Sequence, residues 1–189
     1  MTEKNLEDLL KNESFCSIPF LSMMVNTDGC HKFCCIASGP ESRLINPNNK
    51  KPYHVTVNSI KETWTSDEMK SIRQAMINGD KVPACSACYK QESLGKDSNR
   101  QRSTQEWIRR IGKDEFFANI QKTIDSNYSY ELPIMYLDLR LSNLCNLKCR
   151  MCNPFNSSQI AKEHFDMWWN NEEYQTLWSE QWGKNPIHL

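Results

Sequence analysis

The sequence has no apolar run long enough to span a membrane, and its first residues lack the basic and apolar regions of a secretory signal peptide. It also has no net charge, because 23 Lys and Arg residues balance 23 Asp and Glu residues. A neutral chain offers no general attraction for nucleic acid or anionic lipid. These absences predict a cytoplasmic protein that binds neither a membrane nor nucleic acid.

Histidine is scarce and scattered, with four residues, whereas cysteine is abundant, with nine residues in a chain of 189. A disulfide framework is not expected in the reducing cytoplasm, so metal binding explains the cysteines better. Mean hydropathy is low, at −0.69. Metal ligation would help to hold such a polar chain together, because the free energy of ligand binding adds to that of folding.

Three of the cysteines follow directly on a predicted strand. Residues 135–141 alternate apolar and polar side chains, the period of a strand, and Cys145, Cys149 and Cys152 then have the spacing Cys-x3-Cys-x2-Cys. Three thiolates on a short loop can hold three irons of a [4Fe–4S] cluster and leave the fourth iron open to a substrate or cofactor. Zinc normally has a fourth ligand close by, and the nearest candidate is His164. A zinc site and three buried structural cysteines remain the alternatives.

The strand, the cysteine loop and a following predicted helix resemble the cluster loop of radical S-adenosylmethionine (SAM) enzymes. The resemblance implies that Cys145, Cys149 and Cys152 each ligate one iron of a [4Fe–4S] cluster, and that the open iron binds SAM. An electron from the cluster would then cleave SAM to a 5′-deoxyadenosyl radical. Met151 stands where that family usually has an aromatic residue, and its soft apolar side chain can fill the same space.

A second cysteine pattern precedes residue 90. Asp28-Gly29 predicts a hairpin turn between a buried strand at 20–25 and a return strand at 30–36. A capping box at 65–68 predicts the start of a helix that Gly79 ends. The cysteines around these elements are Cys16 and Cys34, on either side of Gly29, and the pair Cys85 and Cys88 after the helix.

This layout, over residues 15–92, looks like the twitch domain, a short relative of the SPASM domain that carries an auxiliary iron–sulfur cluster in many radical SAM enzymes. The resemblance implies that four thiolates ligate an auxiliary cluster: Cys16, Cys34, Cys85 and Cys88. Four ligands complete the coordination, so such a cluster would relay electrons or brace the structure. The same four residues could instead hold zinc. Cys30 and Cys35 stay unassigned, and strand alternation predicts that Cys35 points away from Cys34.

We therefore expect an α+β protein of two parts. Residues 1–128 would form the twitch-like iron–sulfur domain, a small β-hairpin plus helices with a helical connector. That connector is predicted to start at a capping box at 103–106 and to break near Gly112. Residues 129–189 would begin a radical SAM domain, with a first strand, the cluster loop and one or two helices, the last at about 172–182. The family's Gly-Gly-Glu segment is missing, so we expect only the first β/α unit or units of an incomplete (β/α)6 partial barrel. The chain would then be a truncated gene product, the product of a split gene or a fragment of a longer protein.

The predicted function is that of a radical SAM protein that starts radical chemistry on a peptide or protein substrate, an expectation that rests on analogy with relatives that carry such auxiliary domains. A partner chain would complete the barrel, and the sequence indicates no electron donor and no catalytic residue beyond the cluster ligands. The alternative is a non-catalytic zinc or iron–sulfur module that binds a partner chain.

Overall fold

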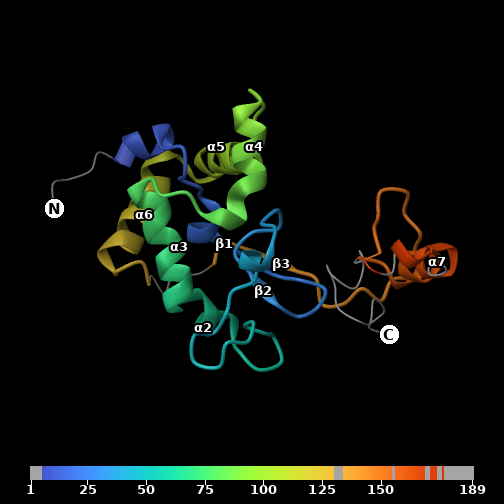
Figure 1. The fold of residues 1–189 in the computed structure, drawn as a ribbon. Coiled ribbons are helices and arrows are strands. Elements are labelled where there is room, and N and C mark those ends of the chain that lie inside the picture. The colour runs from blue at the N-terminus through green and yellow to red at the C-terminus, as the bar shows by residue number, and fades with distance from the viewer. Residues whose placement is uncertain (1–5, 130–133, 155, 169–170, 174–175, 177–189) are drawn as a thin grey trace. The chain divides into compact units, whose positions relative to one another are not determined.

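The computed structural model describes residues 6–129, 134–154, 156–168, 171–173 and 176 (Figure 1). The chain divides into two compact units, Met1–Leu139 and Arg140–Leu189. The predicted first strand of the barrel lies in the first unit, because it pairs with a strand near the N-terminus. Within the described ranges, no helix is both long and apolar enough to cross a bilayer.

The first unit contains a three-stranded sheet in the order β2-β1-β3, built from β1 (Ser22–Val25), β2 (His31–Lys32) and β3 (Tyr136–Leu139). β1 pairs with β2 in antiparallel register and with β3 in parallel register. The predicted hairpin turn is confirmed, and Gly29 has a φ of 77°. A Cβ at Gly29 would lie 2.3 Å from Nε2 of His54, so only glycine fits this turn.

Both predicted strands of this hairpin are shorter than expected. The first begins at Ser22 because the four residues before it form the helix α1 (Ile18–Leu21), which has a proline in its first turn. The second ends at Lys32, so the predicted return strand at 30–36 is wrong beyond that residue. Cys34 and Cys35 therefore do not alternate across a strand.

Helices make up about half of the first unit. Gly79 ends α3 (Asp67–Asn78) in a left-handed conformation, as predicted. The predicted capping box at 65–68 is wrong by one residue, because Ser66 caps the helix by accepting a hydrogen bond from the Met69 N–H, while Thr65 ends α2. The predicted capping box at 103–106 is wrong, because Ser98 and Gln101 form the capping box of α5. The predicted break near Gly112 is confirmed between α5 and α6. The helical elements are η1 (Leu6–Lys11), η2 (Pro40–Ser42), α2 (Ile60–Trp64), α3 (Asp67–Asn78), η3 (Pro83–Cys85), α4 (Ser86–Ser93), α5 (Asn99–Ile111) and α6 (Lys113–Asp125).

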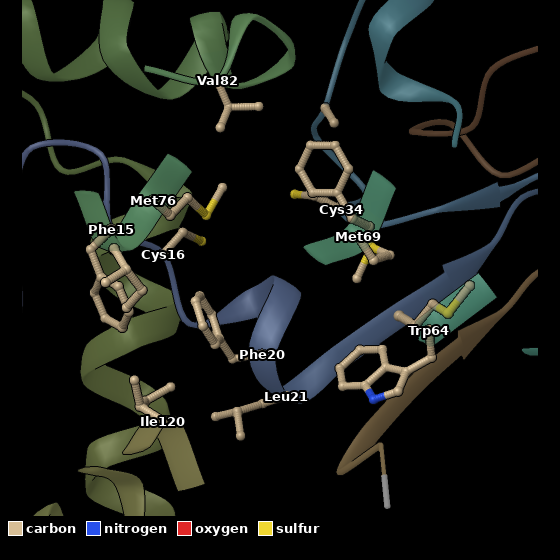
Figure 2. Packing of buried hydrophobic residues seen from close by; sticks show 14 of the residues in the cluster. Phe15, Cys16, Phe20, Leu21, Cys34, Trp64, Met69, Met76, Val82 and Ile120 are labelled. Atoms are coloured by element: carbon tan, nitrogen blue, oxygen red, sulfur yellow. The ribbon is translucent and has the colours of Figure 1, made fainter. Parts of the chain in front are cut away.

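The core of the first unit gathers around α1, which contacts α3, α5 and α6. Phe15 packs against Phe20 with ring centroids 5.6 Å apart and against Phe116 at 6.4 Å. Cys16 and Cys34 belong to the same buried cluster, and Figure 2 shows their sulfur atoms turned toward one another. The segments that carry the predicted auxiliary ligands are therefore part of the core.

The second unit has α7 (Ser158–Trp168) after an irregular loop, and its described residues include no strand. The predicted helix after the cysteine loop is thus confirmed. The predicted last helix at 172–182 lies mostly outside the described residues. The partial barrel is not visible in the described part of either unit and stays a prediction.

Candidate metal centre

The segment that carries Cys16 is held by hydrogen bonds to the end of α3. The side chain of Asn12 accepts from the N–H groups of Ser14 and Phe15, at 2.8 and 3.2 Å, and donates to the carbonyl of Met76 at 3.0 Å. The Ser14 hydroxyl donates to the carbonyl of Gly79 at 3.0 Å. These bonds fix Cys16 at the start of α1, where its side chain is buried.

Cys34 lies in the segment that leaves β2, and that segment is joined to η3. The N–H of Ser38 donates to the carbonyl of Ala84 at 3.2 Å, next to Cys85. Cys85 and Cys88 are three residues apart at the η3–α4 junction, so their side chains lie on neighbouring faces of one turn. Three distant parts of the sequence thus meet at one place.

All four predicted auxiliary ligands line one small cavity: Cys16, Cys34, Cys85 and Cys88. The volume of this cavity that the centre of a water molecule can reach is about 10 Å³. Most of the other residues that line it are apolar. Mononuclear zinc needs four ligands at about 2.0–2.3 Å from one point. No three Cys, His, Asp or Glu side chains in the described residues are arranged to hold a metal ion in that way. Four thiols around an apolar hollow are nevertheless a donor set whose chemistry suits an iron–sulfur cluster or zinc.

In the absence of a metal, the pKa values of three of these thiols, Cys16, Cys34 and Cys85, are raised. Burial raises the pKa of Cys16 to about 12 and that of Cys85 to about 11. The pKa of Cys34 is raised first by a hydrogen bond with the Cys35 thiol and then by burial. Because bound metal favours the thiolate, metal binding would release protons here and add to the stability of the fold.

The two unassigned cysteines do not line this cavity. Cys30 is buried in the hairpin turn, where its N–H donates to the Asp28 carboxylate at 3.0 Å. Cys35 is exposed, and its thiol contacts that of Cys34. The expectation that Cys35 points away from Cys34 is wrong, because the strand on which it rested ends before both residues.

A larger hollow of about 420 Å³ is lined in part by Cys34 and Cys35. One face of α5, including Arg102 and Trp107, forms part of its wall, and β1 and β3 contribute other parts. Cys34 therefore lines both the small cavity and the larger hollow.

The three-cysteine loop belongs to the second unit and is closed by hydrogen bonds to the start of α7. The Ser158 N–H donates to the carbonyl of Asn143 at 2.8 Å, and the Ser157 hydroxyl donates to that of Leu147 at 3.1 Å. Ser157 also accepts from the N–H of Ile160, which caps the helix. These hydrogen bonds close the loop against the N-terminus of α7.

The loop presents its cysteines toward solvent. Cys149 is exposed, and Cys145 and Cys152 are half-buried. Nearby, Leu144 is 72% exposed and Met151 is 96% exposed. The three thiols are not gathered around a common point in the structure, so their joint ligation of a cluster stays a prediction.

Comparison with known proteins bears on the four-cysteine cavity. Residues 16–89 match the SPASM family, described as an iron–sulfur cluster-binding domain. The match begins at Cys16, ends just after Cys88 and covers less than half of the chain. Searches of curated proteins and of solved structures found no match.

The match supports iron–sulfur cluster binding by residues 16–89, and such domains are typical of radical SAM enzymes. The predicted similarity of residues 15–92 to a SPASM relative is thereby confirmed. The match does not extend to the three-cysteine loop. Arg100, which lines the small cavity, also lies beyond the match, and it is not among the site residues predicted from the sequence.

Proposed function

We propose that this chain is a radical SAM protein that holds two iron–sulfur clusters. The main support for the first cluster is that the four matched cysteines line one cavity. The second rests on the spacing of the three-cysteine loop and on its closure against α7. A helix N-terminus directly after the loop favours negative charge, which suits three thiolates.

The residues divide the work between the two sites. Cys16, Cys34, Cys85 and Cys88 would fill the coordination of an auxiliary cluster, which could then pass electrons or brace the fold. Cys145, Cys149 and Cys152 would hold a [4Fe–4S] cluster with one open iron for the amino and carboxylate groups of SAM. When bound and reduced, that cluster supplies the electron that cleaves SAM and starts radical chemistry.

The substrate we propose is a peptide or protein, by resemblance to relatives that carry auxiliary domains. Part of the barrel would come from a partner chain. Two observations support this: exposed apolar side chains flank the loop, and in the described residues β3 pairs on one side only. None of the nine cysteines, all of which are described, forms a disulfide, and this fits a reducing compartment such as the cytoplasm.

A second candidate is a non-catalytic zinc or iron–sulfur module that binds a partner chain. The exposure of Leu144, Leu147 and Met151 favours it, because a partner could cover these side chains without any chemistry. The two candidates differ in whether the three-cysteine loop binds SAM.

The test is anaerobic reconstitution of the full chain with iron and sulfide. We expect about two clusters per chain, and about one after the triple substitution Cys145→Ala, Cys149→Ala and Cys152→Ala. Cys30→Ala is the matched control and should keep both clusters. Tight zinc without iron after anaerobic purification, or loss of both clusters in the triple variant, would argue against the proposal.

Titration with SAM then separates the candidates. A change in the electron paramagnetic resonance spectrum of the reduced wild-type chain, absent from the triple variant, would support the radical SAM function. An unchanged spectrum in the wild type, with both clusters present, would favour the module.

A further inference from the structure

A single arginine lies beside the four-cysteine cavity. Arg100 is only 7% exposed and lines the cavity together with the four cysteines. A buried guanidinium in a mostly apolar wall is costly unless its donors are used. Its contacts therefore indicate what it is placed to do.

Two of these contacts reach the segment that carries Cys16. Nη1 of Arg100 donates to the carbonyl of Phe15 at 2.7 Å and to that of Asn12 at 3.0 Å. On the other side of Cys16, the N–H of Ser17 donates to the hydroxyl of Thr104 at 3.2 Å, and this hydroxyl donates to the Arg100 carbonyl at 2.9 Å. The first two turns of α5 thus hold the backbone on both sides of Cys16.

The remaining contacts reach the helix that carries Cys88. Nε and Nη2 of Arg100 donate to the two carboxylate oxygens of Glu92, at 2.9 and 2.5 Å. Glu92 lies on α4, and Ser98 also donates to its carboxylate. A bidentate ion pair of this kind fixes the relative orientation of the two side chains as well as their distance. Arg100 thereby connects two cysteine-bearing segments that are far apart in the sequence.

The positive charge of Arg100 lies at the wall of the cavity that the four cysteines line. Its buried guanidinium is therefore close to any group that the thiols hold there. An iron–sulfur site held by four thiolates is an anion, and it gains one more negative charge when it is reduced. Net charge close to a cluster is one of the factors that set its reduction potential.

We propose that Arg100 is the positioning residue of the four-cysteine site and that its charge, opposed by Glu92, sets how readily the cluster there is reduced. This rests on the proposed function, in which the four cysteines hold an iron–sulfur cluster. Two unit charges about 10 Å apart at an effective dielectric constant of about 20 shift an equilibrium by about tenfold. We therefore expect changes of that order in the ratio of reduced to oxidised cluster.

The experiment uses the full chain carrying the triple substitution at Cys145, Cys149 and Cys152, so that only the four-cysteine site is loaded. In this background we would compare Arg100→Gln, Arg100→Lys, Glu92→Gln and the control Arg109→Gln, an exposed arginine of the same helix. Iron and sulfide per chain report assembly. The reduced fraction of the cluster at one fixed potential reports charge.

Arg100→Gln should lower the ratio of reduced to oxidised cluster about tenfold, and Glu92→Gln, which leaves the guanidinium unopposed, should raise it. Arg100→Lys should stay near the wild type in this ratio but load less iron, and Arg109→Gln should change neither. A purely structural role would move both charge variants in the same direction, and that result would overturn the proposal. If Arg100→Gln loads no iron, the Glu92→Gln variant decides the outcome. A rise in its ratio of reduced to oxidised cluster would support the proposal, and a fall would overturn it. A parent chain that itself binds no iron would instead contradict the proposed function.

Discussion

Replacing Arg73 with methionine should destabilise the first unit more than the replacement of any single surface side chain. Arg73 is fully buried in α3, and its guanidinium donates to three backbone carbonyls: Pro19 at 2.8 Å, Trp64 at 3.0 Å and Tyr128 at 2.7 Å. It also stacks on the ring of Trp64, 4.1 Å from the centroid. These contacts join α1, α2 and the turn after α6 to one side chain.

The size of the effect follows from the groups left behind. Each buried carbonyl without a donor costs roughly 1–3 kcal/mol, so three cost roughly 3–9 kcal/mol. Removing a buried charge returns part of this, because burial disfavours the guanidinium and lowers the pKa of Arg73 to about 9. We expect a net loss of about 3–5 kcal/mol in the free energy of unfolding.

The assay is anaerobic denaturant unfolding of the metal-free chain, followed by far-ultraviolet circular dichroism. Arg73→Lys should recover only part of the loss, because an ammonium lacks the planar fork that reaches three carbonyls. Arg109→Met is the matched control: this arginine is 76% exposed, and its ion pair should contribute nothing measurable. If Arg73→Met and Arg109→Met unfold at the same denaturant concentration, the role assigned to Arg73 is wrong.

Two further predictions concern Cys34 and His31. Cys34→Ser should remove about half of the iron bound by the reconstituted chain, whereas Cys35→Ser should leave it unchanged; equal losses would contradict the ligand assignment. His31 is fully buried, and burial, followed by the charge of His54, lowers its pKa. The unfolded chain therefore binds the proton more readily, and stability should fall as the pH drops below about 6.5. His31→Gln should flatten this dependence between pH 7 and 5, and an unchanged slope in unfolding experiments would refute the assignment.

Local sequence signals predicted the turns and helix ends well. Gly29, Gly79 and Gly112 each mark a turn or helix end in the structure, because each has a positive φ that other residues rarely adopt. The start of α5 was misplaced because two similar capping patterns compete, at Ser98 and at Ser103. Ser98 is the cap in the structure, and its hydroxyl also donates to the carboxylate of Glu92 on α4, a long-range contact that spacing does not reveal.

The candidate site was predictable to the extent that it depends on cysteine spacing. The four cysteines that were expected to act together do line one cavity. The thiol contact between Cys34 and Cys35 was not predictable, because it depends on β2 ending two residues before them. Arg100 could not be found from its neighbours in the sequence either, since three other arginines lie within ten residues of it and only its packing distinguishes it.

The match to the iron–sulfur family stops before α5, yet the structure makes α5 part of the same site. Cys16 opens the matched region, and Arg100 and Thr104 of α5 hold the backbone on either side of it. Cys88 closes the region, and its helix is tied to α5 through Glu92. On our proposal the matched residues would supply the sulfur ligands, while the helix outside the match would position them and supply the one arginine in the described cavity wall. We therefore expect the site to extend beyond the matched residues to at least Thr104.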